Sequence, residues 1–375
     1  MIPFWVDDPR LREQLGISLF HQRWPWIGGD LQTLRDTLRP VALPLDQGTP
    51  IQIPVPALSS GAAEAGELLA YLDEPLETGG VSSAPPKALV VLLHGLGGSS
   101  RRKGLRRLGL CLQRVGYAVL RLNLRGADPG RHLAGGTYAA ACNSDLLPVL
   151  DRARGLAMQL AGTGSSSGQS SLPLYGAGIS LGGTMLLNAC LDSPAVLDGL
   201  FCASSPLELT LCSTSIERPR NHVYQRWLLQ RLVQQTLADP WGASEREQQL
   251  LMKQPRSIRA FDEAVTAPRW GYESVDDYYS KASPMRRLVD QPHLLPPTLI
   301  LHAFDDPWVP ADSAVQLQQR NKDEVSENSC SPLNVLITER GGHNGFHGLG
   351  DSYDNGCWSD QVACAWFNKR LSASK

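Results

Sequence analysis

The chain has 375 residues, of which 42% are hydrophobic and 19% charged, and its formal net charge is −2. These values fit an ordinary globular protein that buries its core without disulfides or metals. The balanced charge gives no basis for binding nucleic acid, and without a run of about 18 apolar residues no membrane span is predicted. Peripheral membrane contact and the oligomeric state stay open.

The cysteines and the N-terminus indicate a cytoplasmic protein. Eight cysteines are scattered along the chain, with no C-x-x-C pair and no cysteine–histidine spacing of a zinc site. This usage is typical of reduced, buried thiols. The first residues, MIPFWVDDPRLREQ, carry early acids and no apolar stretch, so we expect no secretory signal.

The chain becomes regular only after its first quarter. Residues 1–45 are rich in aromatic residues and proline and predict an arm that packs on a larger domain, and residues 59–86 resemble a loop around a short strand at Leu68–Leu72. Lys87–Leu93 is then an apolar run of strand length, typical of a strand buried on both faces. Further strands are expected at Tyr117–Leu122, Leu172–Ala177, Gly199–Ala203, Thr298–Ala303 and Leu333–Thr338. Helices are expected at Arg101–Val115, Ser144–Leu160 (with Ser144 as N-cap), Leu181–Cys190 and Ser359–Leu371, and an exposed loop at Gly162–Ser171.

Strands alternating with helices predict a single α/β domain over residues 1–375, with a mostly parallel sheet covered by helices on both faces. Residues 206–297 break the alternation, because they contain helical segments such as Tyr224–Thr236 and no clear strand. An insertion between two sheet strands predicts a helical cap over the site. The apolar side chains of the cap could line a slot for an acyl chain or form its own core, namely Trp227, Leu228, Leu229 and Leu232.

The most specific motif is Gly178-Ile-Ser180-Leu-Gly182-Gly183, which matches G-x-S-x-G between a predicted strand and a predicted helix. In an α/β-hydrolase fold this turn is so tight that the nucleophile is strained and its flanking residues must be small. The serine hydroxyl is then exposed at a helix N-terminus, where developing negative charge is favoured. The motif predicts Ser180 as a nucleophile, with Gly178 and Gly182 as the small residues of the elbow.

A serine nucleophile needs a base and an orienting acid, which follow it in that fold in the order Ser, acid, His. Asp305 and Asp306 come directly after one predicted strand, and His343 lies between glycines after the last one. Asp306 is the preferred acid because the acid typically stands three residues before a Val or Ile, here Val309; Asp305 remains the alternative. His343 is preferred over His347 because glycines suit a tight loop at a crowded site.

An oxyanion hole needs two backbone N–H donors aimed at the tetrahedral oxygen. One is expected from Leu181, directly after the nucleophile. The other is expected from the glycine-rich loop His94-Gly-Leu96-Gly-Gly98, where we favour Leu96. A phosphate-cradling function of this loop is not expected, since it lacks G-x-x-x-x-G-K-[ST].

Several motifs together resemble the YheT-like, abhydrolase 1/3-type (EMB8-like) branch of the α/β-hydrolases over nearly the whole chain. They are WIGGDLQT at residues 26–33 (with Asp30 in place of the usual His), the loop at residues 94–100, Asn123-Leu-Arg-Gly126, Ser205–Leu209, Val223–Arg226, and the stretches from Phe261 to Ser283. The resemblance implies Ser180, Asp306 and His343 as nucleophile, acid and base. It also implies hydrolysis of carboxylic esters, with lipid or medium-chain acyl substrates in some members. The sequence departs from the family at Tyr138–Asn143 and at Thr184.

The expected function is therefore that of a serine esterase acting on a small-molecule ester or lipid through an acyl-enzyme, with no metal and no organic cofactor. Two alternatives stay open at this point. The same acyl-enzyme could pass its acyl group to an alcohol, which would make the protein an acyltransferase. The domain could instead bind a ligand without catalysis.

Overall fold

The computed structural model describes residues 7–39, 42–76, 85–162, 171–253, 255–325, 331–352 and 356–373. Phe4 and Trp5 lie outside these described residues, and so does most of the predicted loop at Gly162–Ser171. Within the described part of the chain, no helix is both long and apolar enough to cross a membrane.

Eight strands form one sheet in the order β1-β2-β4-β3-β5-β6-β7-β8. The pairs β1–β2 and β2–β4 are antiparallel, and every pair from β4–β3 to β7–β8 is parallel. The bounds are β1 Thr49–Val55, β2 Gly66–Asp73, β3 Leu89–Leu93, β4 Ala118–Leu122, β5 Leu174–Ile179, β6 Gly199–Ala203, β7 Thr298–Ala303 and β8 Leu333–Thr338. The predicted mostly parallel sheet is confirmed, and all the predicted strands are present.

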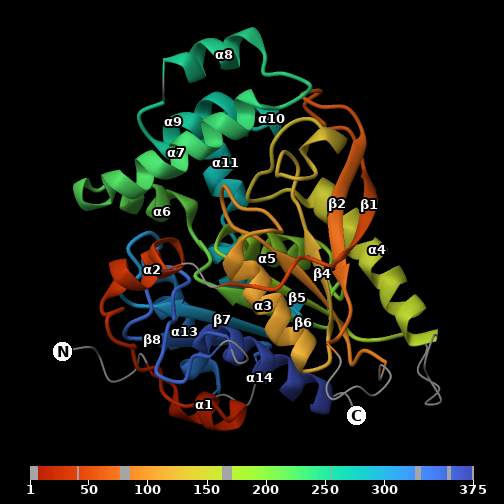
Figure 1. Ribbon diagram of the computed structural model, residues 1–375. Coiled ribbons are helices and arrows are strands. Elements are labelled where there is room, and N and C mark those ends of the chain that lie inside the picture. Colours follow the sequence, from red (N-terminus) through yellow and green to blue (C-terminus); the bar gives the residue numbers. More distant parts are fainter. Residues whose placement is uncertain are drawn as a thin grey trace.

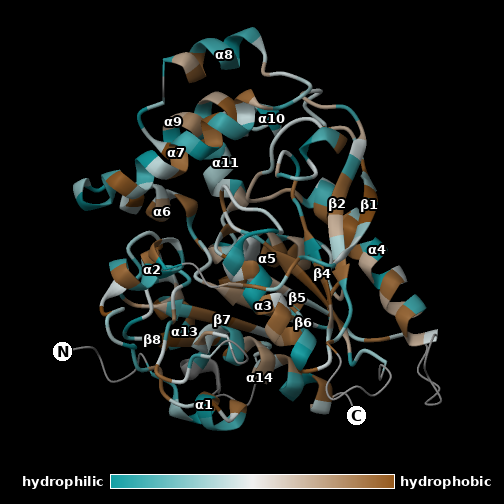
Figure 2. Ribbon diagram, viewed as in Figure 1, coloured by the Kyte–Doolittle hydropathy of each residue, from teal (hydrophilic) through white to brown (hydrophobic). Residues whose placement is uncertain are grey.

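Helices cover both faces of the sheet (Figure 1). The sequence of strand β3 is apolar throughout because both of its faces are buried. Leu89, Val91 and Leu93 belong to one hydrophobic core, together with residues of helices α4 (Asn143–Gly162), α5 (Leu181–Asp192) and α13 (Asp312–Val325). The alternate residues Val90 and Leu92 enter the other core, with α1 (Pro9–Leu15), α3 (Lys103–Arg114) and α14 (Trp358–Ala373). The central strands β5, β6 and β7 are accordingly hydrophobic in Figure 2.

Two local features differ from the sequence analysis. Strand β1 was not predicted; it carries Pro50 and Pro54, which a sheet tolerates only at an edge, and β1 pairs with β2 alone. Ser144 is not the N-cap of α4, because the helix begins at Asn143 and the carbonyl of Cys142 accepts the N–H groups of Asp145 and Leu146.

Between β6 and β7 the described chain forms only helical elements, most of which gather beyond one end of the sheet, opposite α1 and α14 (Figure 1). They are α6 Leu209–Ile216, α7 His222–Leu237, α8 Glu245–Met252, α9 Ile258–Phe261, a π-helical turn at Asp262–Thr266, α10 Ala267–Arg269, α11 Val275–Ala282 and α12 Met285–Asp290, with short 3₁₀ turns. In the N-terminal region, α2 (Gly29–Leu38) follows α1 and contacts the loop after β8.

Candidate active site

Ser180 occupies the turn between β5 and α5, with φ 54° and ψ −128°. This is a backbone conformation that a non-glycine residue adopts only under strain, and strain of this kind concentrates at functional sites. The flanking glycines make the turn sterically feasible. A Cβ at Gly178 would collide with the backbone of Gly183, and one at Gly182 would lie 2.6 Å from the carbonyl oxygen of Leu93.

The loops after β7 and β8 bring two further predicted residues to Ser180. Nε2 of His343 lies 2.9 Å from Ser180 Oγ, and Nδ1 of His343 lies 2.9 Å from Asp306 Oδ2. The second Asp306 oxygen accepts the backbone N–H groups of Trp308, at 2.8 Å, and Val309, at 3.0 Å. Burial alone would raise the pKa of Asp306, but the His343 imidazole and the hydrogen bonds hold it below its usual range. Asp306 is therefore a buried, oriented carboxylate.

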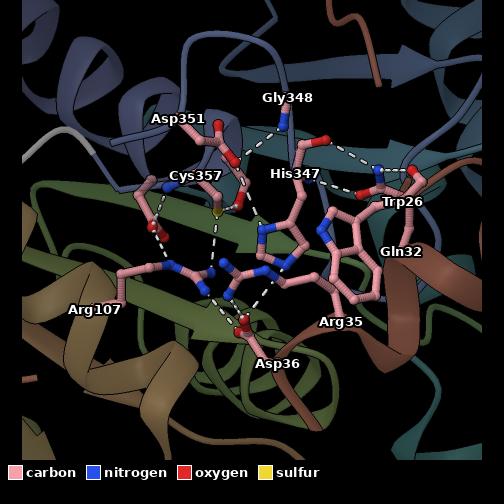
Figure 3. A network of polar contacts seen from close by, with 11 residues as sticks. Trp26, Gln32, Arg35, Asp36, Arg107, His347, Gly348, Asp351 and Cys357 are labelled. Atoms are coloured by element: carbon pink, nitrogen blue, oxygen red, sulfur yellow. Dashed lines mark hydrogen bonds and ion pairs between the residues drawn. The ribbon is translucent and has the colours of Figure 1, made fainter. Parts of the chain in front are cut away.

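Asp305 and His347, the two alternatives, lie outside this chain of hydrogen bonds. Asp305 Oδ1 accepts the N–H of Gly342 at 2.9 Å and so shapes the loop that carries His343. His347 lies in a separate network, with its ring nitrogens 3.5 Å from Asp36 and 3.6 Å from Asp351 (Figure 3). Burial lowers the pKa of His347, and the carboxylates of Asp351 and Asp36 oppose this shift.

Helix α2 supports the loop of His343, a contact that the sequence did not reveal. The hydroxyl of Thr33 accepts the His343 N–H at 2.8 Å and donates to the Gly29 carbonyl at 2.7 Å. The Gln32 side chain donates to the carbonyl of His347 and accepts its N–H, at 3.0 and 2.7 Å (Figure 3). The only sequence signal was the WIGGDLQT motif, to which no role was assigned.

The glycine-rich loop after β3 passes directly against the nucleophile, since a Cβ at Gly95 would lie 2.8 Å from Ser180 Cβ. The N–H of Gly97 donates to the Tyr138 hydroxyl at 2.6 Å, which holds the loop in place. Tyr138 begins the stretch at which the sequence departs from the family that it resembles. Leu181 is the first residue of α5, so its N–H has no partner within the helix. Leu96 and Leu181 thus flank Ser180 from two elements.

A cavity of about 330 Å³ opens on Ser180 and His343. Trp308 lines it and stacks on the imidazole of His343, with ring centroids 4.4 Å apart. Of the apolar cap residues, Trp227, Leu228 and Leu232 line the cavity, whereas Leu229 packs inside the cap against Leu251, Phe261 and Val265. These side chains thus divide between the wall of the cavity and a packed core among the helices. Among the described residues, no group of His, Cys, Asp and Glu side chains is arranged to hold a metal ion.

A family model described as serine aminopeptidase S33 (Hydrolase_4) matches residues 84–332. The chain belongs to this family of α/β-hydrolases. The putative esterase YheT of Escherichia coli is 30% identical over 305 residues, which cover 78% of this chain and 80% of YheT. The predicted membership of the YheT-like branch of the α/β-hydrolases is thereby confirmed.

Other relatives define how far the similarity extends. Phospholipase ABHD3 of Mus musculus is 28% identical over 267 residues, which cover 70% of this α/β-hydrolase but only 59% of ABHD3. The match therefore spans less than two thirds of that relative's length. The crystal structure of carboxyl esterase 2 from Tuber melanosporum matches with a TM-score of 0.50 and 16% identity, covering 88% of this chain and 89% of that one. This likeness concerns the fold, and it agrees with the predicted α/β-hydrolase architecture.

Proposed function

We propose that this protein hydrolyses carboxylic esters through a catalytic triad of Ser180, His343 and Asp306. The observation that carries the proposal is the continuous hydrogen-bonded chain from Ser180 Oγ through His343 to Asp306, with both links at 2.9 Å. A nucleophile in reach of a base, which is in turn oriented by a buried carboxylate, is the arrangement that activates serine. The esterase and phospholipase relatives support an ester as substrate.

In the proposed mechanism, His343 Nε2 takes the proton of Ser180 as its oxygen attacks the ester carbonyl carbon. Asp306 keeps the imidazole in its productive tautomer and stabilises the imidazolium that forms. The N–H groups of Leu96 and Leu181 bind the oxygen that becomes negative. His343 then returns the proton to the leaving alcohol, and the acyl group remains on Ser180. Water, deprotonated by His343, adds to the acyl carbonyl carbon; the bond to Ser180 Oγ then breaks, His343 returns the proton to Ser180 Oγ, and the acid is released.

The helices of residues 206–297 act as a cap that sets acyl preference in this proposal. Their side chains Leu209, Leu228 and Leu232 line the cavity together with Trp308, and most of its exposed wall is apolar. Apolar walls favour an acyl chain over a polar one because burial removes apolar surface from water. Lipid or medium-chain acyl esters therefore fit the cavity better than short polar esters.

A fluorophosphonate probe tests the nucleophile, because it reacts covalently only with activated serines. The native protein is expected to be labelled and Ser180→Ala to be unlabelled and inactive toward a p-nitrophenyl ester. Ser193→Ala, at the other end of α5, is the matched control and is expected to label normally. Labelling of folded Ser180→Ala would refute the assignment.

A further inference from the structure

Two arginines from distant parts of the chain converge on one carbonyl of the glycine-rich loop. Arg102, just before α3, donates through Nη2 to the Gly97 oxygen at 3.2 Å. Arg231, on the cap helix α7, donates through Nε to the same oxygen at 3.2 Å. Both guanidinium groups also lie over the ring of Trp227, at 5.5 and 4.9 Å from its centroid.

This half-buried pair differs from the buried arginines in its lack of a counter-ion. Among the described residues, neither Arg102 nor Arg231 has a carboxylate within ion-pair distance, whereas each of four other arginines has one within 2.7 Å. Those four are Arg107, Arg121, Arg125 and Arg269. Burial and the charge of Arg231 lower the pKa of Arg102 to about 10, so the pair stays positive at neutral pH without compensation. Two unpaired guanidinium groups side by side are stabilised by an anion.

The loop that the pair contacts also packs against the nucleophile. The carbonyl that both arginines bind belongs to Gly97, in the same loop as Gly95, whose backbone packs against Ser180. Arg102 and Trp227 line the same cavity as Ser180 and His343. Each guanidinium carries five N–H donors and uses one of them on Gly97, which leaves donors for a ligand.

We propose that Arg102 and Arg231 form an anion subsite that binds a phosphoryl group of the ester substrate while its acyl carbonyl lies at Ser180. A phosphoryl group fits best because it offers several oxygens to two guanidinium forks at once. The inference rests on the proposed ester hydrolysis for its catalytic consequence, but the binding itself does not require catalysis. Arg102 and Arg231 are then specificity residues for ester substrates that carry an anionic group.

The kinetic test compares two esters that differ only in the phosphoryl group, 1-decanoylglycerol and 1-decanoylglycerol 3-phosphate, below their critical micelle concentrations. The ratio of their kcat/KM values is expected to favour the phosphate ester in the native protein. It should fall about tenfold or more in Arg102→Gln and in Arg231→Gln, since each loses charged hydrogen bonds. Arg102→Lys should recover part of the ratio. The controls Arg101→Gln and Arg226→Gln remove exposed neighbouring charges and should leave it unchanged.

A binding test keeps this inference separate from the proposed hydrolysis. Octyl phosphate, which has no ester carbonyl to cleave, is titrated calorimetrically into Ser180→Ala, with octanol and inorganic phosphate as the two halves of the ligand. We expect octyl phosphate to bind more tightly than either half, and to bind at least tenfold more weakly when Arg102→Gln or Arg231→Gln is added. Equal binding with and without the arginines, or an unchanged ratio of kcat/KM values, would refute the proposed subsite. The two arginines would then only stabilise the glycine-rich loop. If the fluorophosphonate probe does not label the native protein at Ser180, the proposed ester hydrolysis is refuted instead, whatever the binding result.

Discussion

At the scale of single residues, adjacent aspartates take different positions in the site. Asp306 hydrogen-bonds His343, while Asp305 bonds the backbone of the same loop. Asp306→Asn preserves the shape but removes the charge that stabilises the imidazolium, so we expect kcat to fall by about 10⁴-fold. Asp305→Asn keeps an oxygen for Gly342 and should cost less than about tenfold. Steady-state kinetics on a p-nitrophenyl ester measures both.

The two aspartate variants also check each other. Both replace a buried carboxylate by an amide of the same shape, so a general loss of folding would affect them alike. Thermal unfolding of each variant provides the control. A larger loss of kcat in Asp305→Asn than in Asp306→Asn would contradict the assigned acid.

The carboxylate of Asp36 gives a prediction about pH and stability. Burial alone would raise its pKa, but the charges of Arg107 and His347 and hydrogen bonds from Arg35 and Arg107 lower it from 3.8 to about 2 (Figure 3). Because the folded pKa lies below the unfolded one, the ionised group stabilises the fold above about pH 4, and this contribution is lost as pH falls toward 2. It amounts to about 2 kcal/mol.

Asp36→Asn should therefore lower the free energy of unfolding by about this amount at pH 7 and by progressively less below pH 4. Urea unfolding of both proteins at several pH values measures the difference. Asp351→Asn, which neutralises another carboxylate beside His347, is a control from the same network. A difference that is constant with pH would show that Asp36 contributes through its shape and not through its charge.

At the scale of elements, helix α2 positions the catalytic loop through Thr33, which receives the His343 N–H. Thr33→Val keeps the shape of the side chain but removes the hydroxyl. We expect kcat to fall by about tenfold to a hundredfold with little change in KM, because the imidazole loses its alignment with Ser180. Thr33→Ser should restore most of the rate. The exposed Thr37→Val, on the same helix, should behave as the native protein.

A readout beyond overall activity separates this positioning role from a loss of folding. The rate of fluorophosphonate labelling depends on how well His343 activates Ser180, so it should fall in Thr33→Val in parallel with kcat. The unfolding temperature should change far less. If KM rises and kcat is unchanged, Thr33 contacts the substrate instead of holding the loop.

The elements also show what a sequence can and cannot reveal. Strand β3 was predictable because its burial on both faces requires an unbroken apolar run, which is a local property. The elbow was predictable because its glycines are needed for contacts within one turn. The part played by Thr33 was not, because it bonds a residue 310 positions away and a threonine in a helix carries no sign of that partner.

At the scale of the whole molecule, order along the chain predicted which three residues meet in the proposed triad, since each follows its own strand of one parallel sheet. The loops after β5, β7 and β8 open at the same edge, so Ser180, Asp306 and His343 meet there. No such rule of strand order predicts that Arg102 and Arg231 lie together. Its meeting point depends on how the cap packs on the sheet, which no local pattern encodes.

The last prediction concerns how the proposed cap selects acyl chains by their length. Leu232 lines the cavity of about 330 Å³, so Leu232→Trp fills part of the space beside Ser180. We expect the ratio of kcat/KM for a decanoyl ester to that for a butyryl ester to fall about tenfold, because only the longer chain reaches the new ring. Val223→Trp adds the same ring at an exposed position of α7 and should leave the ratio unchanged. An equal loss for both esters would place the acyl chain elsewhere, and the cap would then regulate access to Ser180 without measuring chain length.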